Sequence, residues 1–142
     1  MMPVSTSTIV VDTNVVLYLL LPTSEHTEIA RQVFRKTSQW AAPMFWRSEM
    51  RQALTRYVKN RHISLPSALQ LQAEAEQLFA GQEFGVDSAK VLEAAVASGC
   101  SAYDCEFVVV AKLLGVPLVT NDHQVLRAFP DIAVSPSNFA GA

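Results

Sequence analysis

The sequence feature that most constrains the fold is a short apolar segment near the start, Ile9-Val10-Val11, which ends directly in Asp12. Three β-branched residues in a row predict a strand that is buried on both faces, as in parallel sheets. Ligands of open α/β sheets bind beyond the carboxyl ends of the strands, so a carboxylate at this position is well placed to bind one. Asp12 could instead cap the helix that follows, which is a common role of aspartate.

The rest of the chain alternates helical patterns with short apolar segments. The helical patterns cover residues 14–20, 25–38, 44–61, 64–80, 88–98, 101–114 and 123–129, with expected N-caps at Thr23-Ser24, Ser88 and Ser101. Further strands are expected at residues 40–43, 84–86, 116–120 and 132–134, before a Ser-Pro-Ser tail. Strands separated by helices predict an α/β fold with a parallel sheet. With 142 residues in the chain, we expect a single domain over residues 1–142.

The composition limits the classes of function. Half of the residues are hydrophobic and 17% are charged, which argues against a disordered chain. The formal net charge is −2, so a strongly basic nucleic-acid footprint is absent and nucleic-acid binding would need a local basic patch. No segment has the pattern of a targeting signal or the length of a membrane span, and we expect a cytoplasmic protein with no membrane partner.

Other residues that could react or bind a ligand have simpler interpretations. Cys100 and Cys105 lack a second pair for zinc, and we expect buried, reduced thiols. The three histidines, including His123, are expected at the surface. Trp40 and Trp46 could stack on bases, but their positions on a strand and an apolar helical stripe favour core or dimer contacts.

Four carboxylates share an unusual setting. Asp12 and Asp122 each follow a predicted buried strand, while Glu49 and Asp104 lie on or beside the apolar faces of predicted helices. Each has a simpler explanation: Asp104 could respond to a helix dipole, Asp122 could be a turn or N-cap residue, and Glu49 could pair with Arg56 or with a Lys on another element. It is less plausible that all of these separate explanations hold at the same time.

A divalent cation is the economical partner for these acids. Burying an ionised carboxylate costs several kcal/mol unless it is paired or binds a metal. The chain has 11 Lys and Arg residues, and none lies three, four or seven positions after Asp104 on its own helix. An all-oxygen site suits Mg²⁺ or Mn²⁺.

These segments together resemble a PIN domain, and most closely the VapC-type toxin nucleases of toxin–antitoxin pairs. The matching segments are Val10-Val11-Asp12-Thr13-Asn14, Ser48-Glu49, Ala102-Tyr103-Asp104 and Leu118-Val119-Thr120-Asn121-Asp122. The resemblance implies a three-layer α/β/α fold with a mostly parallel central sheet. It further implies a metal-dependent endoribonuclease whose four acids gather at one pole of the sheet, with supporting roles for Asn14 and Thr120.

The sequence departs from the family pattern at one point. Some relatives carry a further acid close to the last motif, whereas Asn121, His123 and Gln124 flank Asp122 here. This difference implies that a second metal binds weakly or only together with substrate. Glu106 is a poor substitute by its helical angle and is expected at the surface or an interface.

The expected chemistry is metal-assisted cleavage of a phosphodiester bond. Metal ions lower the pKa of bound water and neutralise charge on the phosphate and the leaving oxygen. Arg56 shares the flank of Glu49 on the predicted third helix and is the leading candidate for a phosphate contact. Arg127, Glu74 and Glu76 are expected to be solvated. By resemblance, the products would carry a 5′-phosphate and a 3′-hydroxyl.

The sequence therefore predicts an Mg²⁺- or Mn²⁺-dependent ribonuclease that is the toxin of a toxin–antitoxin pair. Its expected partners are an RNA substrate, an antitoxin protein and a second copy of the chain. One alternative is a catalytically silent PIN-like module with an RNA-binding or regulatory role. Another is an Mg²⁺-dependent phosphatase, in which a second Asp commonly follows two positions after the nucleophile, where this chain has Asn14.

Overall fold

The central sheet consists of five parallel strands in the order β3-β2-β1-β4-β5. The structure is a computed structural model and describes residues 7–21 and 25–141. The strands are β1 Thr8–Val11, β2 Gln39–Pro43, β3 Glu83–Phe84, β4 Leu118–Val119 and β5 Ala133–Val134. In β1, Val10 pairs with Ala41 on one side and with Leu118 on the other. The segment Ile9–Val11 is almost fully buried, as its β-branched sequence predicts.

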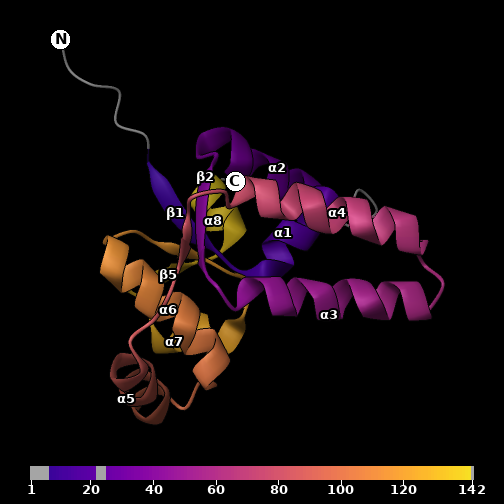
Figure 1. Cartoon of the computed structure of the whole chain (residues 1–142). Coiled ribbons are helices and arrows are strands. Elements are labelled where there is room, and N and C mark those ends of the chain that lie inside the picture. Colours follow the sequence, from indigo (N-terminus) through magenta and orange to yellow (C-terminus); the bar gives the residue numbers. More distant parts are fainter. Residues whose placement is uncertain (1–6, 22–24, 142) are drawn as a thin grey trace.

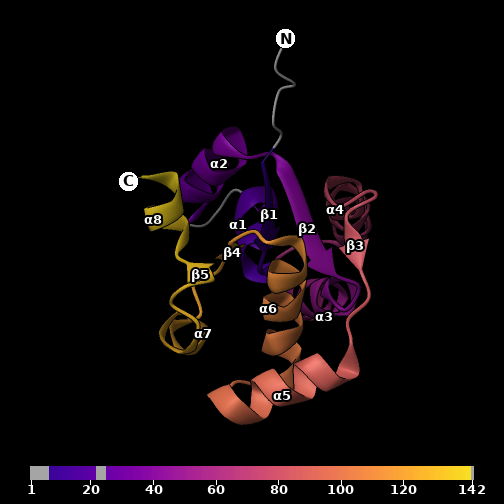
Figure 2. The same cartoon turned by 90° about the vertical axis from the view of Figure 1, so that its left-hand side faces the viewer.

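Helices cover both faces of this sheet. They are α1 Thr13–Leu20, α2 Thr27–Lys36, α3 Trp46–Lys59, α4 Leu65–Leu78, α5 Ser88–Ser98, α6 Ala102–Leu114, α7 His123–Ala128 and α8 Pro136–Ala140. Figures 1 and 2 show α6 on one face and α1 with α2 on the other, which gives the expected three-layer α/β/α architecture. Helices α3 and α4 run side by side and project beyond the sheet (Figure 1).

Helix α6 is the central helix of its layer. It buries Cys105 and the run from Phe107 to Ala111 against the sheet. Ser101 caps its start, because the Ser101 hydroxyl accepts a hydrogen bond of 3.0 Å from the backbone amide of Asp104. Gly115 ends the helix in the left-handed conformation, at φ 67°. The sequence predicted both ends correctly.

Several boundary predictions need correction. The sheet is parallel as expected, but β3, β4 and β5 are each only two residues long, shorter than the segments 84–86, 116–120 and 132–134 that were expected. Helix α5 has Asp87, not Ser88, at its N-cap position. The expected Ser-Pro-Ser tail forms α8, which the Ser135 hydroxyl caps. The proposed Thr23-Ser24 cap includes residues outside those described.

The buried aromatic and sulfur side chains belong to the core. Trp40 and Trp46 are both fully buried, which confirms the core interpretation and leaves them no surface for base stacking. Cys100 and Cys105 are buried and free, as expected. Trp46 Nε1 donates a hydrogen bond of 2.7 Å to Glu83 Oε2, so its polar group is satisfied inside the protein.

Glu76 is not a freely solvated acid. It accepts a hydrogen bond of 3.1 Å from Arg47, which also forms a two-pronged contact with Glu83. This network ties α3 to α4 and β3. The expectation that Glu76 is solvated was therefore wrong, because the sequence does not show that Arg47 faces α4.

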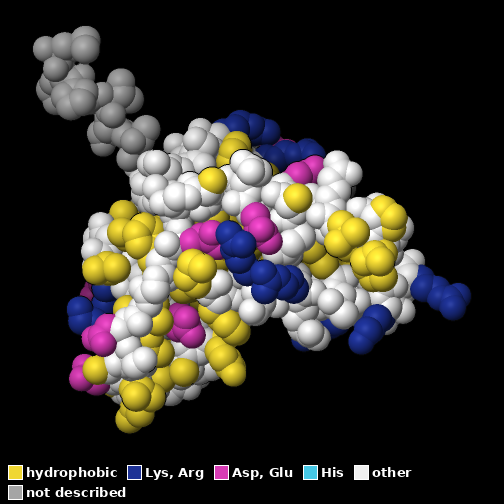
Figure 3. Space-filling model, viewed as in Figure 1, with side chains coloured by type: hydrophobic (Ala, Val, Ile, Leu, Met, Phe, Trp, Pro, Cys, Tyr) yellow, Lys and Arg dark blue, Asp and Glu magenta, His cyan; other side chains and the backbone are white. Residues whose placement is uncertain are grey.

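The surface carries two groups of exposed hydrophobic side chains. On the face shown in Figure 3 they gather over α5 and near the far end of the α3–α4 pair. The strongly exposed members on α4 and α5 are Leu65, Leu69, Leu92 and Val96. Among the described helices, none alone has the length and apolarity to cross a membrane; α5 and α6 pass that test only as a pair, which is bent by 116°.

Candidate metal centre

Asp12 and Thr120 follow neighbouring parallel strands and contact each other. The Thr120 hydroxyl donates a hydrogen bond of 2.8 Å to Asp12 Oδ2, and the Asp12 amide donates to the carbonyl of Val119 at 3.0 Å. Asp12 occupies the N-cap position of α1 without a regular side-chain capping bond, although a contact with the Asn14 backbone also favours its ionised carboxylate. Capping therefore explains the Asp12 carboxylate only in part, and the Thr120 hydroxyl is a second donor to it.

Asp122 combines a structural role with a place beside this pair. Its Oδ1 accepts a hydrogen bond of 3.0 Å from the Val125 amide and caps α7, and its own amide donates to the Thr120 hydroxyl at 3.1 Å. Asp122 is therefore an N-cap residue, as the simpler explanation proposed. The cap also fixes the carboxylate at the edge of the sheet where Asp12 lies.

Glu49 reaches the same region from α3. Its Oε1 accepts a hydrogen bond of 2.8 Å from the hydroxyl of Thr13, the first residue of α1. Thr13 is buried, while Glu49 is partly exposed. No ion pair joins Glu49 to Arg56 in the parts of the chain that are described. The pairing alternative for Glu49 is therefore wrong, and Thr13 is a contact that the sequence interpretation missed.

Asp104 lies in the first turn of α6 and is half-buried. It lines a narrow cavity together with Asp12, Phe107 and Thr120. The sequence placed Asp104 within the apolar stripe of its helix, and this position beside Phe107 agrees with that prediction.

Burial and repulsion between neighbouring charges raise the pKa values of Asp12 and Asp104. For Asp12 the largest cause is burial, which the hydrogen bonds from Thr120 and the Asn14 backbone partly offset, while the charges of Asp104 and Asp122 add to the rise. For Asp104 burial again dominates, and the charge of Asp122 contributes further. Asp12, Asp104 and Asp122 are therefore close enough to repel one another.

Glu49 belongs to the same charged group. Burial raises its pKa to about 7, the Thr13 hydrogen bond lowers it, and the charges of Asp12, Asp104 and Glu106 raise it again. Glu106 was expected at the surface or an interface, but it is partly buried and acts on Glu49. The angle of Glu106 on its own helix did not indicate this effect on Glu49, because the sequence does not show how near Glu106 of α6 lies to Glu49 of α3.

The donor set of the four acids fits a hard divalent cation. All four acids offer carboxylate oxygens, and none of the ion pairs among residues 7–21 and 25–141 involves them. As the side chains stand, however, no group of three or more Asp, Glu, His or Cys residues in that part of the chain is arranged to hold a metal ion. The chemistry is suitable, but the coordination geometry is not formed.

A cavity of about 310 Å³ opens beside Asp12 and Glu49. Its lining includes Asn14, Phe45 and the exposed Arg56. Arg56 thus shares a cavity with two of the acids, as a phosphate contact would require. Neither Arg127 nor His123, both exposed, lines this cavity.

Tyr18 is a further neighbour that the sequence interpretation missed. Burial and the Asp12 charge raise the pKa of its hydroxyl, and a hydrogen bond with the Asn121 side chain partly offsets the rise. Tyr18 and Asn121 therefore adjoin the acids from two different segments. The sequence pattern of α1 places Tyr18 on a helix but does not indicate that it lies near the acids.

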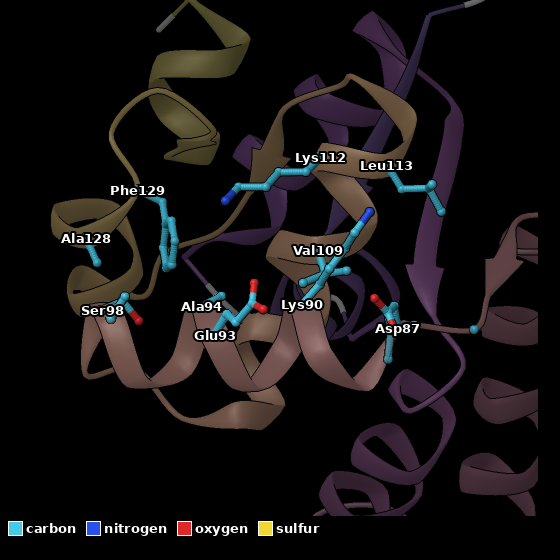
Figure 4. A pocket seen from close by; sticks show the side chains of 13 residues that line it. Asp87, Lys90, Glu93, Ala94, Ser98, Val109, Lys112, Leu113, Ala128 and Phe129 are labelled. Carbon is cyan, nitrogen blue, oxygen red and sulfur yellow. The ribbon is translucent and has the colours of Figure 1, made fainter.

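A larger cavity lies elsewhere. It measures about 570 Å³ and is bounded by α5, the second half of α6 and the end of α7 (Figure 4). Lys90, Glu93 and Lys112 line it with Phe129, and the Lys112 ammonium lies 5.7 Å from the centre of the Phe129 ring. The four acids are not among its lining residues, so cavity size does not identify the acidic site.

Comparisons with known proteins identify the family and support the fold. The family model of the PIN domain matches residues 9–132. The structure is similar to PAE2754 from Pyrobaculum aerophilum, with a TM-score of 0.71 and 19% identity over 96% of this chain and 92% of that chain. It is also similar to FitAcB from Neisseria gonorrhoeae, with a TM-score of 0.68 and 19% identity over 90% of this chain and 97% of that chain. No curated protein matches the chain. At these identities the structural likeness concerns the fold.

Proposed function

The chain belongs to the PIN domain family, and from that premise we propose that it is a divalent-metal-dependent endoribonuclease, of the VapC type, in a toxin–antitoxin pair. PIN domains are generally nucleases that use divalent metals. The proposal assigns residues 1–142 to one nuclease domain. It assigns metal ligation to Asp12, Glu49, Asp104 and Asp122.

One observation carries this proposal. Four acids that are remote in sequence act electrostatically on one another at the carboxyl ends of β1 and β4 and at the starts of α3 and α6. Within residues 7–21 and 25–141, no Lys, Arg or His forms an ion pair with them. A protein gains nothing in stability from such a cluster, because like charges at short range destabilise the folded state. Binding of a cation would offset this cost.

The residues around the acids support specific roles in the reaction. Thr120 holds Asp12 and Thr13 holds Glu49, so two of the carboxylates are oriented before any ion binds. Arg56 lies in the same cavity as both acids and would contact a phosphate of the substrate, while Asn14 would orient a polar group there. When bound, Mg²⁺ or Mn²⁺ supplies an activated water and neutralises charge on the phosphate. The proposed products carry a 5′-phosphate and a 3′-hydroxyl.

The proposal includes two protein partners, an antitoxin and a second copy of the chain. The exposed hydrophobic side chains near the end of the α3–α4 pair and over α5 support protein contacts (Figure 3). The two groups lie on different elements, so that one group is available to the antitoxin and the other to the second copy of the chain.

A second candidate function is RNA binding or regulation by a catalytically silent PIN domain. The observation that favours it is the lack of a formed three-ligand arrangement among the described acids, histidines and cysteines. A silent domain has no need to keep repelling acids beside each other, which is why we rank this function second.

The proposal is tested by cleavage of a 5′-labelled single-stranded RNA with Mn²⁺, with Mg²⁺ and with EDTA. We expect cleavage with either metal and none with EDTA. Asp104→Asn should lower the rate by about 10²–10³-fold while the protein stays folded. Asp131→Asn, an exposed aspartate outside the cluster, is the matched control and should cleave like the wild type. Absence of cleavage by the wild type with every metal would favour the silent module.

A further inference from the structure

Two aromatic rings stack at the edge of the candidate site. The rings of Phe45 and Tyr103 have their centres 4.8 Å apart and are inclined by only 13°. Phe45 immediately precedes α3, and Tyr103 lies in the first turn of α6, directly before Asp104. The pair therefore joins the starts of the two helices that carry Glu49 and Asp104.

The two rings extend from the acidic cavity out to solvent. Phe45 is partly buried and lines the 310 Å³ cavity together with Asp12, Glu49 and Arg56. Tyr103 is 60% exposed although one side of its ring packs on Phe45. Packing of the core does not account for so exposed a ring, since the core of α6 lies on the side of Phe107 and Val108.

We propose that Phe45 and Tyr103 form a stacking platform for an unpaired base of a single-stranded nucleic acid, next to the phosphate that is cleaved. Aromatic side chains bind single strands in this way, because every base offers a π face. The position of the platform relative to the cleaved bond rests on the proposed nuclease function. The stacking itself does not require cleavage.

The charge of the chain limits what phosphate contacts contribute to binding of a nucleic acid. With 11 Lys and Arg against 13 Asp and Glu, the protein lacks the surplus of positive charge from which phosphate-driven binding gains its affinity. Near the acids the cavity contributes one guanidinium, that of Arg56. Stacking then has to supply much of the affinity for substrate. A duplex keeps its bases inside the stack, so the platform selects single strands.

The test uses a single-stranded RNA with 2-aminopurine at one position, whose fluorescence is quenched when the base stacks. Titrations are made in EDTA, so that no cleavage occurs. We expect quenching on binding to the wild type and to Tyr103→Phe, which keeps the ring. Tyr103→Leu should bind about tenfold more weakly and lose the quenching, since one stacked base contributes about a factor of ten or more. The same RNA in a duplex should bind weakly to all of them.

Leu113→Ala is the matched control, because Leu113 is 62% exposed at the other end of α6 and should not affect binding. Wild-type affinity and wild-type quenching in Tyr103→Leu would overturn the proposal, as would equal binding of the duplex. The two proposals fail separately. Quenching without cleavage in Mn²⁺ contradicts the nuclease but not the platform, whereas metal-dependent cleavage without any quenching contradicts the platform alone.

Discussion

The hydroxyl of Thr13 donates a hydrogen bond of 2.8 Å to Glu49 Oε1, which joins residues 36 positions apart in the chain. Through this bond the first residue of α1 orients a carboxylate in the first turn of α3. Thr13 directly follows Asp12, so one short segment supplies an acid and positions another. The hydrogen bond also makes Glu49 easier to ionise than burial alone would allow.

Substitution Thr13→Val keeps the shape of the side chain but removes the donor. We expect the Mn²⁺ concentration that gives half-maximal RNA cleavage to rise about 10- to 100-fold, because groups that orient metal ligands contribute this much to metal affinity. Thr13→Ser keeps the hydroxyl and should remain close to the wild type. If valine and serine variants respond alike to Mn²⁺, the hydrogen bond has no part in metal binding.

The ionisation of Glu49 should make stability depend on pH. Its pKa is about 7 in the folded protein against a usual 4.5, so the folded state binds more protons than the unfolded chain between these values. Stability should therefore fall as the pH rises through this window. Glu49→Gln removes the charge and should gain about 1–2 kcal/mol over the wild type at pH 8, after screening of a partly exposed group. Urea unfolding at pH 5 and pH 8 without metal measures this, and an equal difference at both pH values would contradict it.

Thr120 should contribute to stability through two hydrogen bonds. It donates to Asp12 Oδ2 and accepts from the amide of Asp122, and its side chain is 1% exposed. Thr120→Val removes both hydrogen bonds, and we expect a loss of about 1–3 kcal/mol in the free energy of unfolding. Thr55→Val is the control, because the exposed Thr55 hydroxyl donates a hydrogen bond only to the Arg51 carbonyl of its own helix. Similar losses in both variants would show that Thr120 has no special role.

The contact between Arg47 and Glu83 should matter for the fold but not for the chemistry. Glu83 accepts from Arg47 at 2.6 and 2.7 Å and from the buried Trp46 indole at 2.7 Å. Glu83→Ala should lower the free energy of unfolding by about 2–3 kcal/mol, since a hydrogen bond to a charged group contributes this much. Glu28→Ala, which removes only exposed ion pairs, should cost less than about 1 kcal/mol. A change in the cleavage rate of folded Glu83→Ala would contradict this separation.

The sequence predicted those parts of the structure that local pattern determines. The β-branched run of β1, the Ser101 cap and Gly115 stop of α6, and the place of Asp12 beyond a strand all follow from neighbouring residues. Helix α8 was missed although its signal is local, with Ser135 as cap and Pro136 at the first position. Serine and proline near the end of a chain are also typical of a tail, which is why the local signal did not lead to a helix prediction.

The contacts that complete the candidate site were not predictable in this way. Thr13 with Glu49 and Phe45 with Tyr103 join segments whose relative placement depends on the packing of whole helices. Glu106 was excluded by its angle on α6, but that angle says nothing about how close α3 approaches. Sequence spacing locates a residue on its own element, whereas contacts between elements require the assembled fold.

The proposed function requires that the acids of four separate segments bind a divalent cation together. Calorimetric titration of Mn²⁺ into the wild type, Asp104→Asn and Asp131→Asn, without RNA, tests it most directly. The account predicts saturable binding by the wild type and by Asp131→Asn, and binding at least about tenfold weaker by Asp104→Asn. Equal binding by all three proteins, or no binding by the wild type, would contradict the account.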